Sequence, residues 1–126
     1  LDLMELNQYT GECHFYKCGA SASYWIRHGQ IHEIAADRQP LGLSPAPSGF
    51  DEVLYLESGD IVILLSDGIA EEFYESPELL RAGMERLKTE NPTDIATGIL
   101  ELAVKAAGAI RDDMTVLVVS LYQEVN

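Results

Sequence analysis

Residues 57–73 read ESGDIVILLSDGIAEEF, and the apolar run from Ile61 to Leu65 inside them decides the fold. The run has no polar position on either face of a strand, which is typical of a central strand that is covered on both sides. Ser66-Asp67-Gly68 follows at once, so a carboxylate stands where the strand leaves the core. The stretch predicts a layered fold with a charged group at one end of its central strand.

The residues upstream of this run have the pattern of strands joined by turns. Strands are predicted at residues 1–8, 13–18, 23–27, 30–35, 51–56 and 60–65. His28-Gly29 is predicted to be a two-residue hairpin turn in which glycine supplies the positive φ. Glu57-Ser58-Gly59 is expected to join the last two strands as another hairpin. The stretch 36–50, which holds three of the five prolines, is predicted to be a loop.

Downstream of Phe73 the apolar period changes from that of strands to that of helices. Ser76-Pro77 is predicted to begin one helix and Asn91-Pro92 a second. Their apolar faces are expected to be Leu80, Met84 and Leu87 in the first helix, and Ile95, Ile99, Leu102, Ala103 and Ala106 in the second. A last strand is predicted over residues 114–122. Strands, two helices and a final strand predict a layered α+β domain.

The composition is strongly acidic, with 8 Lys+Arg against 21 Asp+Glu in 126 residues and a net charge of −13. Such a balance argues against binding to nucleic acid, which needs a basic surface, and against docking on an anionic membrane. No apolar run approaches the ~20 residues of a membrane-spanning helix. We therefore expect no nucleic-acid partner and no membrane contact within this segment.

The two cysteines, Cys13 and Cys18, lie five residues apart in one predicted strand. Their side chains are then expected on opposite faces, where they cannot easily form a disulfide. Reduced thiols favour a cytoplasmic location. A membrane tether further upstream in a parent protein stays open.

A second acidic motif, Arg111-Asp112-Asp113, stands directly before the last apolar strand. If this strand and the run 61–65 are antiparallel neighbours, Asp67 and Asp112 converge at one sheet edge. Two carboxylates that close need a metal, a shared proton or an arginine, and Mg²⁺ and Mn²⁺ prefer oxygen ligands. The simpler alternative is that Asp67-Gly68 is a turn, and that Asp112-Asp113 are charged residues that protect the following strand from aggregation. The spacing alone favours this alternative.

ESGDIVILLSDGIAEEF, followed by RDDMTVLVVSL at 111–121, resembles the C-terminal half of the PPM, or type 2C-like, metal-dependent Ser/Thr protein phosphatases. Residues 1–34 (LDLMELNQYTGECHFYKCGASASYWIRHGQIHEI) resemble in particular the bacterial branch of stage II sporulation protein E. Gly19–Ser23 in place of the Gly-His-Pro-Pro pattern, and the loop 39–42, fit that branch. The resemblance extends over essentially the whole chain. It implies a β-sandwich flanked by helices, with two Mn²⁺ or Mg²⁺ ions at one end.

The resemblance also implies roles for individual residues. Asp67 and Asp112 correspond to family aspartates that coordinate one of the two ions, and Glu71 to an additional ligand found in some relatives. Three neighbours are implied to support them: Gly68, Asp113 and Thr115. No catalytic residue beyond the metal ligands is expected, and the resemblance does not identify the residues that bind substrate.

The implied reaction is hydrolysis of phosphoserine or phosphothreonine by a water that the two ions acidify. The implied substrate is a bacterial signalling phosphoprotein; in the sporulation branch, which regulates a sigma factor, it is a phosphorylated anti-anti-sigma factor. The family's bridging aspartate lies in a Gly-Asp-Gly-type motif, which this chain lacks. Residues 1–126 are therefore expected to be the C-terminal part of a single domain without its N-terminal part, inactive alone and prone to form a homodimer through open strand edges.

A different class of function stays open beside this one. The chain can instead be a non-catalytic regulatory or interaction module with a degenerate phosphatase fold. The upstream sequence distinguishes the two, because only the enzyme needs the bridging aspartate there.

Overall fold

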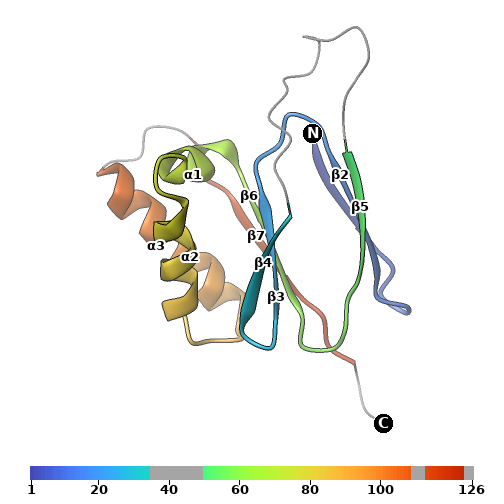
Figure 1. Cartoon of the computed structure of the whole chain (residues 1–126). Helices are drawn as coiled ribbons and strands as arrows, with labels where there is room; N and C mark the ends of the chain where they lie inside the picture. The colour runs from blue at the N-terminus through green and yellow to red at the C-terminus, as the bar shows by residue number, and fades with distance from the viewer. Residues whose placement is uncertain (35–49, 109–112, 124–126) are drawn as a thin grey trace, which may run out of the picture.

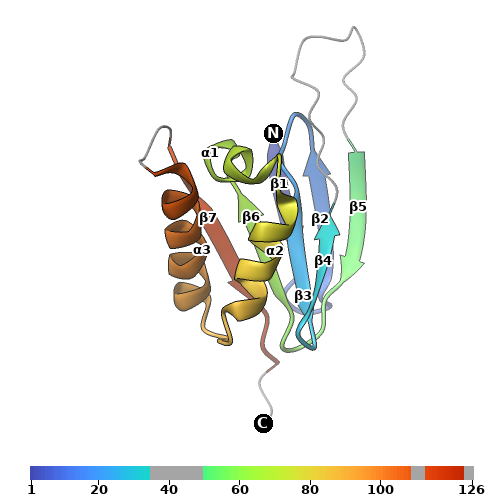
Figure 2. The same ribbon diagram turned by 60° about the vertical axis from the view of Figure 1, so that its left-hand side comes forward.

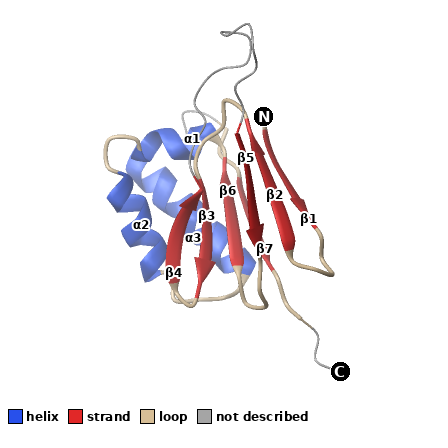
Figure 3. Ribbon diagram, turned by 45° about the vertical axis from the view of Figure 1, so that its right-hand side comes forward, coloured by secondary structure: helices blue, strands red, loops and turns tan. Residues whose placement is uncertain are grey.

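The structure is a computed structural model that describes residues 1–34, 50–108 and 113–123. It has three layers: a pair of helices, a four-stranded sheet and a three-stranded sheet (Figures 1 and 3). The predicted α+β class, with a β-sandwich flanked by helices, is confirmed.

The strands of the described part are β1 (Asp2–Leu6), β2 (Glu12–Lys17), β3 (Ser23–Arg27), β4 (Gln30–Ile34), β5 (Phe50–Tyr55), β6 (Ile61–Leu65) and β7 (Val116–Ser120). The three-stranded sheet has the order β1-β2-β5 and the four-stranded sheet the order β4-β3-β6-β7. All of these pairings are antiparallel. The predicted loop at 36–50 lies outside the described residues, except that Phe50 begins β5.

Strand β6 is buried at all five positions, as its apolar run predicts. Ile61, Ile63 and Leu65 belong to the core that the helices share with the four-stranded sheet. Val62 and Leu64 belong to the core between the two sheets. Because its side chains enter both cores, β6 joins the three layers. Burial of each such side chain contributes roughly 1.5–3 kcal/mol to stability.

The predicted hairpin turn at His28-Gly29 is confirmed. It joins β3 and β4, whose last pair is Arg27 with Gln30. His28 has a φ of 51° and Gly29 a φ of 75°, so both turn residues adopt the positive φ that such a hairpin requires.

The second predicted hairpin is wrong, because β5 and β6 lie in different sheets. β5 pairs with β2, and β6 pairs with β3 and β7. Residues 56–60 instead carry the chain from one sheet to the other, and the N–H of Leu56 donates to the carbonyl of Gly11 at 2.8 Å. A turn-like segment such as Glu57-Ser58-Gly59 shows that the chain reverses, but not which strand it will pair with.

The helices of the described part are α1 (Asp67–Ala70), the 3₁₀ helix η1 (Glu71–Phe73), α2 (Pro77–Arg86) and α3 (Pro92–Ala107). Helices α2 and α3 cover one face of the four-stranded sheet and begin where predicted (Figure 2). At α3, Asn91 Oδ1 accepts hydrogen bonds from the N–H groups of Thr93 and Asp94 at 2.9 and 3.2 Å. The short helices α1 and η1 were not predicted from the sequence.

The prediction that Ala106 belongs to the buried face of α3 is wrong. Ala106 is exposed, whereas Ala107 is buried together with Ile95, Ile99 and Ala103. These four residues repeat at intervals of four, which rotates the buried face slightly away from Ala106.

Cys13 and Cys18 are both free, and burial raises the pKa of the Cys13 thiol to about 11. No helix in the described residues is long and apolar enough to span a membrane.

Candidate metal centre

Asp67 lies where the central strand β6 leaves the core. Ser66 is the N-cap of α1, and Asp67 is the first residue of that helix. The Asp67 side chain is exposed, although Gly68 and Ile69 directly after it are buried. Asp67-Gly68 therefore starts a short helix rather than forming an isolated turn, and this places the carboxylate at the surface above the core.

The end of β6 and the start of β7 are joined by hydrogen bonds. The N–H of Ser66 donates to the carbonyl of Thr115 at 3.0 Å, and the N–H of Thr115 donates to Ser66 Oγ at 2.9 Å. The strands are antiparallel, with Leu65 opposite Val116. The segment before β7 is thus brought to the end of β6 that carries Asp67. Asp112 and Arg111 themselves lie outside the described residues.

A cavity of about 200 Å³ adjoins Asp67. Its wall combines the start of β1, the β2–β3 connection and the end of β6, through Leu1, Asp2, Gly19, Ala20, Ser21, Leu65, Ser66 and Asp67. Figure 2 shows the start of the chain beside α1 at this end of the molecule. Two carboxylates, those of Asp2 and Asp67, therefore line one small hollow.

Ser21 is the hydrogen-bond partner of Asp67 within the described part of the chain. Its side chain is almost fully buried, and its hydroxyl donates to Asp67 Oδ1. The second carboxylate oxygen, Oδ2, has no hydrogen-bond partner among the described residues. A carboxylate with one oxygen fixed by a hydroxyl, and the other unbonded within residues 1–34, 50–108 and 113–123, has the donor chemistry that Mg²⁺ and Mn²⁺ prefer.

The other predicted site residues take different positions. Glu71 is exposed in η1, and Gly68 is buried within α1. Asp113 and Thr115 are exposed just before β7. None of these lines the cavity beside Asp67, and residues 1–34, 50–108 and 113–123 contain no group of three or more His, Cys, Asp or Glu side chains that could hold a metal ion.

The sequence did not single out Ser21 or Lys17, which lies behind it. Lys17 is 1% exposed, and its Nζ donates to Asp2 Oδ1 at 3.0 Å, to the Ser21 carbonyl at 2.7 Å and to Ser23 Oγ at 2.7 Å. The available signal was weak. Cys13, Phe15 and Lys17 alternate on the inward face of β2, so a lysine stands where the pattern calls for an apolar residue.

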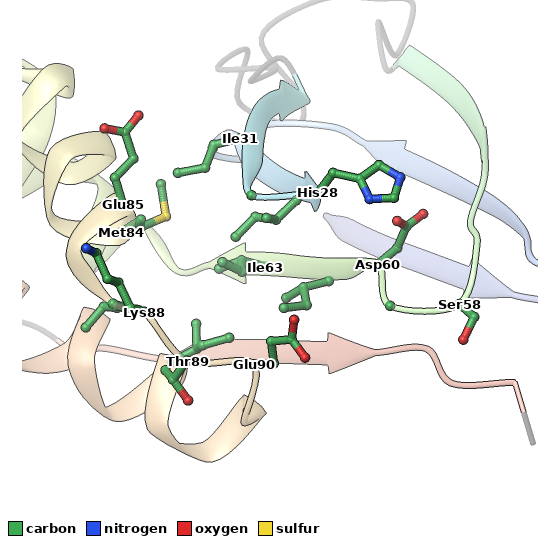
Figure 4. A pocket seen from close by; sticks show the side chains of 16 residues that line it. His28, Ile31, Ser58, Asp60, Ile63, Met84, Glu85, Lys88, Thr89 and Glu90 are labelled. Carbon is green, nitrogen blue, oxygen red and sulfur yellow. The ribbon is translucent and has the colours of Figure 1, made fainter.

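A larger cavity, of about 590 Å³, lies at the opposite end of β6 (Figure 4). The β3–β4 turn, residues 58–61 and the end of α2 line it, and no predicted site residue does. Asp60, on its wall, is 2% exposed, and Arg27 donates to it from Nε at 3.0 Å and from a terminal nitrogen at 2.6 Å. Burial alone would raise the pKa of Asp60, but hydrogen bonds from Arg27 and from the Glu57 N–H outweigh it and lower that pKa.

Comparison with known families decides the relationship. The family model of stage II sporulation protein E (SpoIIE) matches residues 1–122. The chain belongs to this family. Over 128 aligned residues it is 35% identical to stage II sporulation protein E of Bacillus subtilis strain 168, covering 96% of this chain and 15% of that protein.

Solved structures of the same family have the same fold. The phosphatase domain of the cell-fate determinant SpoIIE from Bacillus subtilis, presoaked with Mn, superposes with a TM-score of 0.86 at 30% identity, over 100% of this chain and 58% of that one. The serine/threonine phosphatase PstP/Ppp of Mycobacterium tuberculosis shares the fold alone, with a TM-score of 0.67 at 20% identity over 90% of this chain and 56% of that one. The chain thus spans little more than half of the solved domains that it matches.

Proposed function

We propose that this chain is the C-terminal part of a PPM-type protein serine/threonine phosphatase domain, and that Asp67 is one of its metal ligands. The observation that carries the proposal is the placement of Asp67. It is a surface carboxylate at the end of a fully buried central strand, it lines a cavity, and it is fixed there by Ser21. Membership of the SpoIIE family supports the same activity.

The residues present fit a hard divalent cation, and the Mn-presoaked relative supports Mn²⁺ or Mg²⁺ as that cation. When bound, such an ion lowers the pKa of water and stabilises the charge that develops on a phosphoryl group. Asp67 would hold the ion through its open oxygen, and Ser21 would fix the other oxygen. Asp112 is proposed as a second ligand, because β7 begins beside the end of β6. Glu71 is proposed as an additional ligand, since it follows Asp67 by one helical turn.

The proposed substrate is a phosphoserine or phosphothreonine of a bacterial signalling protein, such as a phosphorylated anti-anti-sigma factor. The acidic chain, with a net charge of −13, supports a substrate whose phosphorylated residue lies in basic surroundings. The chain's few basic side chains leave the phosphate to be held mainly by metal ions.

The direct test is Mn²⁺-dependent hydrolysis of a phosphoserine protein by the full-length protein that contains this sequence. Asp67→Asn should abolish turnover and leave the fold intact. Glu101→Gln is the matched control, because it also removes one exposed carboxylate, from the middle of α3. Folded parent protein that binds the phosphoprotein but hydrolyses none of it with Mn²⁺ would favour the non-catalytic module instead.

We also propose that the remainder of a complete domain covers the outer face of the three-stranded sheet. No described element packs on this face, and it exposes Leu3, Val53 and Tyr55, the last of them 67% exposed. On its own, the chain should be inactive and should form a homodimer through this face. Sedimentation of the isolated chain, residues 1–126, and of its Val53→Asp variant tests this. The unsubstituted chain should sediment as a dimer and the variant as a monomer, and a monomeric unsubstituted chain would contradict the dimer.

A further inference from the structure

The buried lysine Lys17 is the least expected side chain of the sandwich. It lies at the end of β2, and its Nζ is enclosed between the two sheets, with acceptors on β1, on the β2–β3 connection and on β3. Transfer of an ammonium group out of water is costly unless hydrogen bonds and an opposite charge compensate for it. Here the three N–H donors have three acceptors, and Asp2 supplies the opposite charge.

Stability alone does not account for a lysine at this position. A well-packed apolar side chain in place of a buried ion pair is often neutral or stabilising. The neighbouring inward positions of β2, Cys13 and Phe15, are apolar in this way. The acceptors of Lys17 suggest what the lysine contributes, because one of them is the backbone of Ser21.

Ser21 connects the buried lysine to the proposed metal ligand. Its carbonyl accepts from Lys17 at 2.7 Å, while its hydroxyl donates to the Asp67 carboxylate. The segment that carries Ser21, residues 18–22, passes from the three-stranded to the four-stranded sheet and lies outside the strands on either side. Within this segment the backbone of Cys18 is hydrogen-bonded to Leu1, whereas the carbonyl of Ser21 is hydrogen-bonded to Lys17.

We propose that Lys17 is a positioning residue for Asp67: its ammonium group fixes the backbone of Ser21, and the Ser21 hydroxyl in turn orients the Asp67 carboxylate that lines the cavity. Asp2 neutralises the ammonium charge, so the cavity is not faced by an uncompensated cation. The inference rests on the proposed function, because it assigns Lys17 and Ser21 to the metal site described there. Outer contacts of this kind typically change metal affinity by 10- to 100-fold.

The test is Mn²⁺ binding, measured by calorimetry and by electron paramagnetic resonance on the full-length protein. Ser21→Ala should weaken Mn²⁺ binding by about 10-fold. Activity should recover to within about threefold of the parent value at saturating Mn²⁺, because the metal ligands themselves are intact. Ser58→Ala is the matched control: its hydroxyl accepts a hydrogen bond from Gln123 at the other end of β6, and its Mn²⁺ affinity should not change.

Lys17→Met should weaken Mn²⁺ binding to a similar degree. The double variant Lys17→Met/Ser21→Ala should bind Mn²⁺ no more weakly than the weaker-binding single variant, because both substitutions act on Asp67 through the same hydrogen bond from the Ser21 hydroxyl. If Lys17 were only structural, Lys17→Met would lower the melting temperature and leave the Mn²⁺ affinity of the folded protein unchanged. Should Lys17→Met fail to fold, Lys17→Leu, which also removes the N–H donor to the Ser21 carbonyl, takes its place.

The outcomes separate this inference from the proposed function. Mn²⁺ affinity of Ser21→Ala or of the folded Lys17 variant within twofold of the parent would overturn the positioning role, and phosphatase activity would be untouched by that result. Parent protein that binds Mn²⁺ and hydrolyses no phosphoprotein would overturn the function, while weaker Mn²⁺ binding by both variants would still support the positioning role. Parent protein that binds no Mn²⁺ would overturn both.

Discussion

The two ends of strand β6 each carry an aspartate, and the two aspartates are in opposite situations. Asp60, just before the strand, is 2% exposed and accepts hydrogen bonds from the Arg27 side chain and from the N–H of Glu57. Asp67, just after the strand, is exposed and is bonded to a single hydroxyl within the described residues. The first carboxylate is already compensated by Arg27, whereas no residue in the described part of the chain bonds to the second oxygen of Asp67.

The contrast assigns different roles to two residues of the same type, a structural role to Asp60 and a proposed functional role to Asp67. An aspartate with a guanidinium partner stabilises the crossing between the sheets, at residues 56–60. An aspartate without a cationic partner among the described residues is suited to a metal ion. Four predictions test the contrast, from the largest expected effect to the smallest.

The largest effect is expected at Asp67. Asp67→Asn should lower Mn²⁺-dependent phosphatase activity by more than the roughly 100-fold that marks the upper range for outer contacts, because it removes a direct ligand. Mn²⁺ should raise the melting temperature of the parent protein and not that of the variant. A variant that keeps either response would show that Asp67 is not a ligand.

The second prediction concerns Asp60. Asp60→Ala should lower the free energy of unfolding by about 3 kcal/mol, since it removes the buried carboxylate that accepts from the partly buried Arg27 guanidinium and leaves it the more exposed Glu57. Urea unfolding measures this loss. The Mn²⁺ affinity of the folded variant should equal that of the parent, and a lower affinity would contradict the separation of the two ends.

The third prediction concerns acid. The folded-state pKa of Asp60 lies below the ordinary value of 3.8, so its contribution to stability is fully present above that pH and is lost as the pH falls below it. The difference in unfolding free energy between the parent and Asp60→Asn should be constant from about pH 7 to pH 5 and should narrow below about pH 4. A difference that does not change with pH would mean that the pair with Arg27 contributes nothing.

The smallest effect is expected at Ser66. Ser66→Ala removes the acceptor of the Thr115 N–H, a single hydrogen bond between the end of β6 and the start of β7. The expected cost is about 1 kcal/mol in the free energy of unfolding. Ser58→Ala, which removes a similar bond to Gln123, provides the comparison at the opposite end. A cost near zero would show that the backbone bonds, from the Ser66 N–H to the Thr115 carbonyl and in the pairing of Leu65 with Val116, hold these ends together without the side chain.

The sequence predicted the elements whose signals are local. The run Ile61–Leu65 is apolar throughout, and this alone predicts a strand that is buried on both faces. His28-Gly29 and Asn91-Pro92 carry the chemistry of a turn and of a helix start, and the structure has both. The sequence could not predict that residues 56–60 cross from one sheet to the other. The strand that pairs with β5, β2, lies about forty residues upstream, and nothing in the sequence of β5 specifies it.

The candidate site divides in the same way. Asp67 could be identified because it directly follows a buried strand, and its position at the start of α1 agrees with that argument. Ser21 could not, because its contact with Asp67 joins residues 46 positions apart. The burial of Lys17 could not be predicted from its residue type, because lysines are usually solvated. Only the alternation of buried positions along β2 indicates that this lysine points inward.

The order in which the chain visits its two sheets has a consequence for folding. Strands β1 and β2 enter one sheet, β3 and β4 the other, β5 returns to the first, and β6 and β7 complete the second. Neither sheet can therefore be finished before the chain has crossed between them more than once, and pairings so distant in sequence form slowly. During synthesis, β7 is the last of these strands to leave the ribosome. The proposed metal site, with Asp67 after β6 and Asp112 before β7, should consequently be completed only when β7 pairs with β6, and a chain that ends before β7 should bind the ion more weakly.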